Sequence, residues 1–221
     1  MKKMIKVVLI SIFLSAVGYA QAGIINFISL TEAPGGYGEG AWDPLVLSVG
    51  GVTMTVTGHS TSDTDGKQFA YLDWGNAGLG TCQDVVDGTK VNTMVSGRST
   101  NNCDPSSDDN VSFYEFLRFT FDSDVVIDNF WFNNNHDGGF GAGDKVNIGG
   151  TDYLVMTGYA GGANGIGSFM VSAGDYIDVA FSNEQFYVSG VEVRKLAEPG
   201  SLLMILIGLG SLLGVRRWCG N

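Results

Sequence analysis

Acidic and amide side chains gather directly after the second cysteine of the chain, in a pattern that could bind a hard cation. Asp104, Asp108, Asp109 and Asn110 supply oxygen atoms within seven positions. Ca²⁺ takes about six to eight oxygen ligands, so the segment is a candidate calcium site. Its spacing differs from that of an EF-hand loop, and the same residue types form turns by bonding their own backbone. The residues favour a turn, with calcium as the alternative, and they indicate no other cofactor.

A second segment, "NFWFNNNHDGGFG", combines aromatic and amide side chains. Trp131 could stack on a sugar ring while Asn133 and Asn135 bond to its hydroxyl groups, so these three residues are candidate ligand-binding residues. The alternative is a buried strand end followed by an Asn/Gly turn. The pattern favours the strand end and turn.

Catalytic patterns are sparse. The chain has two histidines, His59 and His136, and no G-x-S-x-G nucleophile elbow. A glycosidase needs only two carboxylates, but none of the many acidic residues stands out as a pair. We therefore predict no enzyme activity. The alternative is an extracellular enzyme that acts on polysaccharide.

The charge of the chain narrows its range of partners. Residues 23–197 carry 22 Asp and Glu against 7 Lys and Arg, a net charge of −15. Such a surface repels phosphate backbones, so we expect no nucleic-acid partner.

The elements that would hold these residues are short strands. Apolar and polar residues alternate at 52–57, 113–121 and 177–182, and residues 125–132 are nearly all apolar, as in a strand covered on both faces. In "FYVSGVEV" the apolar phase shifts at Gly190, which indicates a β-bulge. No part of the body shows a sustained helical period. We predict an all-β protein, an antiparallel β-sandwich with a jelly-roll-like topology, over residues 23–193.

The N-terminal 22 residues have the three parts of a secretory signal peptide. A basic start is followed by an apolar stretch and by Ala20-Gln21-Ala22, a small-residue cleavage site at Ala20 and Ala22. The alternative, a first membrane helix, is disfavoured by this length and ending. We expect the mature chain to begin near Gly23.

The C-terminus carries a short apolar stretch between two distinctive flanks. Residues 202–215 have no charge, and as a helix they would span about 21 Å of the ~30 Å hydrocarbon core. Glu198, Pro199 and Gly200 precede the stretch, and Arg216 and Arg217 follow it. The arginines should stay cytoplasmic and leave the body outside. These features are typical of a processing signal with a short transmembrane helix.

This tail resembles the sorting domain of the PEP-CTERM family of exported bacterial proteins. Glu198 and Pro199 match the last two positions of the Pro-Glu-Pro box, with Ala197 in place of its first proline. The resemblance implies that residues 198–221 are recognised by a membrane-embedded exosortase, that the host is Gram-negative, and that it makes exopolysaccharide. Residues 194–197 would then be a linker.

Three cysteines divide between two compartments in this interpretation. Cys82 and Cys103 lie in the exported body, and Cys219 lies beyond the basic pair. An oxidising compartment favours a disulfide between the first two, whereas a reducing one would leave free thiols. We predict the Cys82–Cys103 disulfide.

The body is also similar to secreted domains found upstream of such tails, in "GLGTCQDV", "NNCDPSSDDNVS", "NFWFNNNHDGGFG" and "GDKVNIGG". This second resemblance implies architecture and sorting. The expected function is that of a secreted cell-envelope, cell-surface or extracellular-matrix protein of a biofilm, reached through an inner-membrane intermediate. Its role would be structural or ligand-binding, such as adhesion or association with exopolysaccharide.

Overall fold

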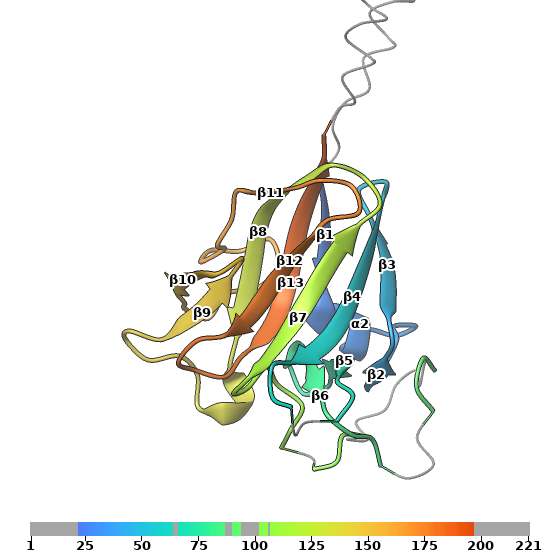
Figure 1. Cartoon of the computed structure of the whole chain (residues 1–221), viewed down its shortest axis with the longest axis vertical. Coiled ribbons are helices and arrows are strands. Elements are labelled where there is room, and N and C mark those ends of the chain that lie inside the picture. The colour runs from blue at the N-terminus through green and yellow to red at the C-terminus, as the bar shows by residue number, and fades with distance from the viewer. Residues whose placement is uncertain (1–21, 64–65, 87–89, 94–101, 106, 197–221) are drawn as a thin grey trace, which may run out of the picture. The chain divides into compact units, whose positions relative to one another are not determined.

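The computed structural model describes residues 22–63, 66–86, 90–93, 102–105 and 107–196. One compact unit runs from Ala22 to Lys195 (Figure 1). Residues 1–21 of the predicted signal peptide lie outside the described residues, whereas Ala22, a predicted cleavage residue, begins the first strand. The whole predicted tail, 198–221, with its box, Gly200, apolar stretch and basic pair, also lies outside them. Within the described part of the chain, no helix is long and apolar enough to span a membrane.

Two antiparallel sheets make up this unit (Figure 1). Sheet A has the order β11-β8-β13-β6-β5-β2, with β1 also paired to β13. Its strands are β1 (Ala22–Asn26), β2 (Gly40–Trp42), β5 (Phe69–Asp73), β6 (Gly78–Cys82), β8 (Val125–Asn133), β11 (Phe169–Val171) and β13 (Tyr187–Lys195). Sheet B has the order β10-β9-β12-β7-β4-β3. Its strands are β3 (Leu45–Val49), β4 (Val52–Ser60), β7 (Glu115–Phe121), β9 (Lys145–Ile148), β10 (Thr151–Leu154) and β12 (Tyr176–Phe181).

The core lies between the two sheets and follows the predicted alternation. Strand β7 buries every second residue from Glu115 to Phe121, and β4 buries its valines and Met54 while its threonines face outward. One apolar cluster contains side chains from both sheets. The prediction of an all-β protein with two antiparallel sheets is confirmed.

Strand β8 is covered on both faces, as its apolar run predicts. Phe130 and Phe132 join the core, while Trp131 on the opposite face is only 2% exposed. The loop before β11 covers Trp131, and its glycines allow the close approach: a Cβ on Gly158 would lie 3.0 Å from the indole ring.

The irregularity predicted near Gly190 is present. The pairing of β13 with β8 shifts register between Val188 and Gly190, and again between Glu192 and Val193. The first shift lets Val188, Val191 and Val193 all reach the core although they are not evenly spaced.

Two features differ from the sequence-based expectations. A six-residue helix, α2 (Phe27–Glu32), follows β1, and the side chain of Asn26 accepts a hydrogen bond from the backbone N–H of Ser29. Fewer than two helical turns are too short to show a period. Strand β13 also continues to Lys195, into the predicted linker, and Arg194 forms two hydrogen bonds with Asp128 on β8.

Candidate functional sites

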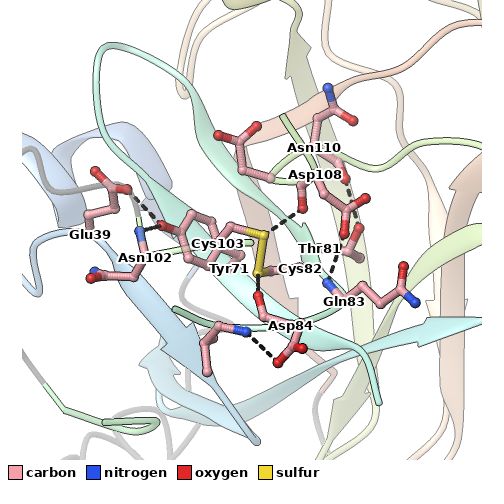
Figure 2. The surroundings of a disulfide bond; sticks show 12 residues. Glu39, Tyr71, Thr81, Cys82, Gln83, Asp84, Asn102, Cys103, Asp108 and Asn110 are labelled. Atoms are coloured by element: carbon pink, nitrogen blue, oxygen red, sulfur yellow. Dashed lines mark hydrogen bonds between the residues drawn. A yellow bond between two sulfur atoms is a disulfide. The ribbon is translucent and has the colours of Figure 1, made fainter. Parts of the chain in front are cut away.

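A disulfide joins Cys82 and Cys103 and fixes the segment that follows Cys103 on the outer face of sheet A. We call the described residues 104–105 and 107–110 of this segment the disulfide loop. Figure 2 shows this bond beside Tyr71 of β5. Both cysteines are buried and pack with Ala41 and Tyr71 in a small second cluster, separate from the main core. The sulfur atoms lie 2.7 and 2.9 Å from backbone oxygens; because a disulfide has no proton to donate, these are close contacts and not hydrogen bonds. The pairing predicted from the sequence is present in the structure.

Glycine in β6 makes room for this loop. Gly80 faces outward opposite Tyr71, and a Cβ at position 80 would lie 2.1 Å from the backbone oxygen of Asp109. On the inner side, the hydroxyl of Thr81 donates a hydrogen bond to the backbone oxygen of Asn110. The loop is therefore held against the strand at Gly80, where a larger residue would collide with it.

Three carboxylates are buried between the outer face of sheet A and the segments that cover it. Glu39, Asp73 and Asp109 are 3%, 3% and 7% exposed. Tyr71 donates a hydrogen bond of 2.6 Å to Glu39, and Tyr187 of β13 donates one of 2.6 Å to Asp109. We call these five residues, together with His136, the acidic cluster.

His136 links the cluster to a short 3-10 helix, η1 (Asn135–Asp137). Its Nδ1 lies 3.1 Å from Oδ2 of Asp73, and its Nε2 lies 2.8 Å from the backbone oxygen of Gly75. The distance between Nδ1 of His136 and Oδ2 of Asp73 is that of an ion pair, but the geometry is not that of a hydrogen bond. Asp137 accepts a hydrogen bond from the amide of Asn110, so η1 and the disulfide loop are joined directly.

Burial raises the pKa of the carboxyl groups in this region. Desolvation, and then the nearby carboxyl group of Asp109, raise the pKa of Asp73 to about 8. Desolvation also raises the pKa of Glu39, although the hydrogen bond from Tyr71 opposes it. On β7 of the other sheet, burial raises the pKa of Glu115 to about 7. The raised pKa favours the protonated form of Asp73, which avoids burying a carboxylate charge.

The geometry of the acidic cluster suits a structural role. The side chain of Asp73 is only 5% exposed, so a substrate in solution cannot reach it. The residues around Asp73 form contacts that hold the disulfide loop and η1 on the sheet. Among the residues that the structure describes, no group of three or more His, Cys, Asp or Glu is arranged to hold a metal ion.

The four candidate calcium ligands point to separate partners. Asp108 accepts a hydrogen bond from the backbone N–H of Gln83, Asp109 accepts from Tyr187, and Asn110 donates to Asp137. Asp104 is exposed, and its backbone N–H bonds to Asp84. These contacts fit the favoured turn interpretation, and calcium binding stays an untested alternative.

The environment of Trp131 agrees with the favoured interpretation, a buried strand end, and leaves no exposed ring for the candidate sugar-stacking role. Its ring is buried and its Nε1 donates a hydrogen bond of 3.0 Å to Gly162. Asn133 is fully buried and donates to the backbone oxygen of Ala77, while Asn135 is exposed and bonds to the hydroxyl of Tyr159. The three residues form no common surface, because Trp131 and Asn133 belong to a strand that is covered on both faces and Asn135 begins η1.

An open groove lies instead at the edge of the sandwich where β12 begins. It has a volume of about 510 Å³, within the range of ligand sites. Its lining includes the turn between β9 and β10, part of β11 and the start of β12, namely Gly149, Gly150, Met170, Asp175, Tyr176 and Asp178. Met170 and Tyr176 are 79% and 54% exposed.

Tyr176 is held in place by an arginine. The guanidinium carbon of Arg118 on β7 lies 3.6 Å from the centre of the Tyr176 ring. Arg118 in turn donates two hydrogen bonds, of 2.8 and 2.9 Å, to the two oxygens of Asp178. Arg118 and Asp178 face each other on paired strands, and Thr120 pairs with Tyr176, so the sheet itself sets this arrangement.

Sequence reasoning places Arg118 and Asp178 on outward faces but does not bring them together, because strand pairing is not visible in the pattern of residues.

No protein-family model, characterised protein or solved structure matches the chain.

Proposed function

We propose that the chain is an exported protein of a Gram-negative cell envelope or extracellular matrix, sorted by an exosortase through its C-terminal tail. Its role there is structural or ligand-binding, in association with exopolysaccharide, and not catalytic. The N-terminal signal peptide and the short apolar C-terminal helix belong to this proposal.

The disulfide is the observation that carries the proposal of export. Disulfides persist in oxidising compartments and are rare in the cytosol of mesophiles. Here the bond between Cys82 and Cys103 spans a sequence separation of 21 and fixes the loop that completes the acidic cluster. The chain therefore contains a bond that an exported protein can keep.

The sandwich supports a binding role more than a catalytic one. A glycosidase would need two carboxyl groups facing a substrate. The side chain of Asp73 is buried and cannot face a substrate, and both oxygens of Asp178 in the groove already accept hydrogen bonds from Arg118. We also propose that the topology is jelly-roll-like, because consecutive strands repeatedly change sheet, from β6 to β7, from β7 to β8 and from β12 to β13.

Replacing Glu198 and Pro199 with alanine tests the sorting signal directly. In a host that contains an exosortase, the native chain should lose its apolar tail and leave the inner membrane. The double variant should keep the tail and stay in the membrane fraction. A matched variant at the exposed Asp175, Asp175→Asn, lies outside the tail and should be processed normally. Equal processing of the native chain and the double variant would refute the motif assignment.

A further inference from the structure

The groove at the start of β12 has an exposed aromatic side chain that an arginine already contacts. Tyr176 is 54% exposed and lines the groove, while Arg118 covers one face of its ring at 3.6 Å. Because Arg118 is itself held by two hydrogen bonds to Asp178, the ring loses little further freedom on binding. The groove therefore offers a rigid, flat apolar surface.

Polar and flexible groups surround that surface. Asp175 is exposed beside Tyr176 and can accept hydrogen bonds from hydroxyl groups. Met170 adds an adaptable apolar side chain to the lining, and Gly149 and Gly150 add a turn without side chains. One aromatic face with a few polar acceptors is the pattern of a site that recognises a ring bearing both C–H and O–H groups.

The charges in the groove disfavour an acidic ligand. Among the described residues that line it, none is basic, and Arg118, the cation that contacts Tyr176, is already paired with Asp178. Asp175 adds a negative charge, and residues 23–197 carry a net charge of −15. A polymer of uronic acids would meet repulsion without a compensating ion pair.

We infer that this groove binds a neutral polysaccharide, with a sugar ring stacked on Tyr176 and its hydroxyl groups bonded to Asp175. The C–H groups on one face of a pyranose carry a small positive charge and complement the negative face of the aromatic ring. This inference rests on the proposed function, because it names the ligand class of an exopolysaccharide-associated protein.

Affinity electrophoresis of the full chain tests the inference. Native gels would contain a neutral polymer (dextran or hydroxyethyl cellulose), a uronate polymer (alginate) or an amine-bearing polymer (chitosan). We expect retardation by at least one neutral polymer and none by alginate. Tyr176→Ala should weaken neutral binding by about tenfold or more, whereas Tyr176→Phe, which keeps the ring, should bind nearly as the native chain does.

Tyr114→Ala is the matched control. Tyr114 has the same exposed fraction as Tyr176, 54%, but precedes β7 at the end far from Thr120, the residue that pairs with Tyr176. The control should bind as the native chain does. Equal binding by Tyr176→Ala and Tyr114→Ala would overturn the inference.

Two other outcomes would also overturn it. One is the absence of neutral binding by a protein whose disulfide is closed. The other is binding to chitosan or alginate alone, abolished by salt, which would indicate ion pairing in place of stacking. The intact mass of the same preparation separates the two claims: an unprocessed chain without the disulfide would refute the proposed function, whatever the groove binds.

Discussion

Replacing Asp73 with asparagine tests the physical account of the acidic cluster. The amide has nearly the shape of a protonated carboxyl group and cannot ionise. Asp73 is buried, and the groups that face it are Glu39 before β2, Tyr71 beside it on β5, Asp109 of the disulfide loop, Tyr187 of β13 and His136 of η1. Asp137 of η1 is also near Tyr187. Of these groups only His136 can carry a positive charge.

The sign of the effect follows from the raised pKa. The pKa of Asp73 is about 8 in the folded protein, against 3.8 for an ordinary aspartate. Between these values the folded state keeps a proton that the unfolded chain has released. The stability that this proton provides is complete below the lower value, falls steadily between the two values and is lost once the pH has risen through the higher one.

The size of the effect is about 1.4 kcal/mol per pH unit for one group. From pH 5 to pH 8 the native protein should therefore lose about 4 kcal/mol that Asp73→Asn does not lose. His59, whose pKa is lowered by burial and then by Arg118, acts in the opposite direction, but it is present in both proteins and cancels in their difference.

Urea unfolding of both proteins from pH 5 to pH 9, with the disulfide intact, gives the required free energies. We expect the variant to gain on the native protein steadily up to about pH 8 and then to run parallel to it. Asp175→Asn, at an exposed carboxylate, is the control and should not gain in this way. Parallel profiles for Asp73→Asn and the native protein over the whole range would refute the buried, protonated state of Asp73.

Three further changes test the surroundings of the cluster. Replacing both Cys82 and Cys103 with alanine should lower the free energy of unfolding by about 3 kcal/mol in the chain-entropy model, measured in urea; an unchanged value would contradict the stabilising role of the bond. Gly80→Ala should cost about 2–3 kcal/mol, because its Cβ would meet a backbone oxygen at 2.1 Å. Gly40→Ala on β2, where the nearest atom is 3.7 Å away, should cost much less, and equal costs would count against the close packing of the loop. Glu115→Gln should gain on the native protein by about 1.4 kcal/mol per pH unit only up to about pH 7, in the same urea assay, and a gain that continued to pH 8 would contradict the assigned pKa.

The sequence predicts the two-sheet fold well where one face of a strand is buried. In β4, β7 and β12 the alternation of apolar and polar residues sets which side chains reach the core. It fails for β5 and β6, where four of five and all five residues are buried, because the disulfide loop covers the face that would otherwise meet water. A strand whose outer face is covered by a loop shows no alternation of apolar and polar residues in its sequence.

The candidate sites show the same limit. The "GLGTC" segment places Gly78, Gly80 and Cys82 on one face, which in retrospect signals a close approach of backbone to that face. The segment around Trp131 left two interpretations open, because an aromatic residue beside asparagines looks alike in an exposed surface and in a covered strand end; the favoured one, the covered strand end, is the one present. Tyr176 was missed as a candidate binding residue, because that role depends on its contact with Arg118, which lies on another strand and 58 positions earlier in the sequence.

The intact mass of the protein from an exosortase-containing host, measured without reduction on cell-associated and released material, tests the central claim most directly. We predict a chain that begins near Gly23, ends close to Glu198–Pro199 and gains about two mass units on reduction, when the disulfide takes up two hydrogens. A chain that keeps both termini, with Cys82 and Cys103 as free thiols, would contradict the account of an exported and sorted protein.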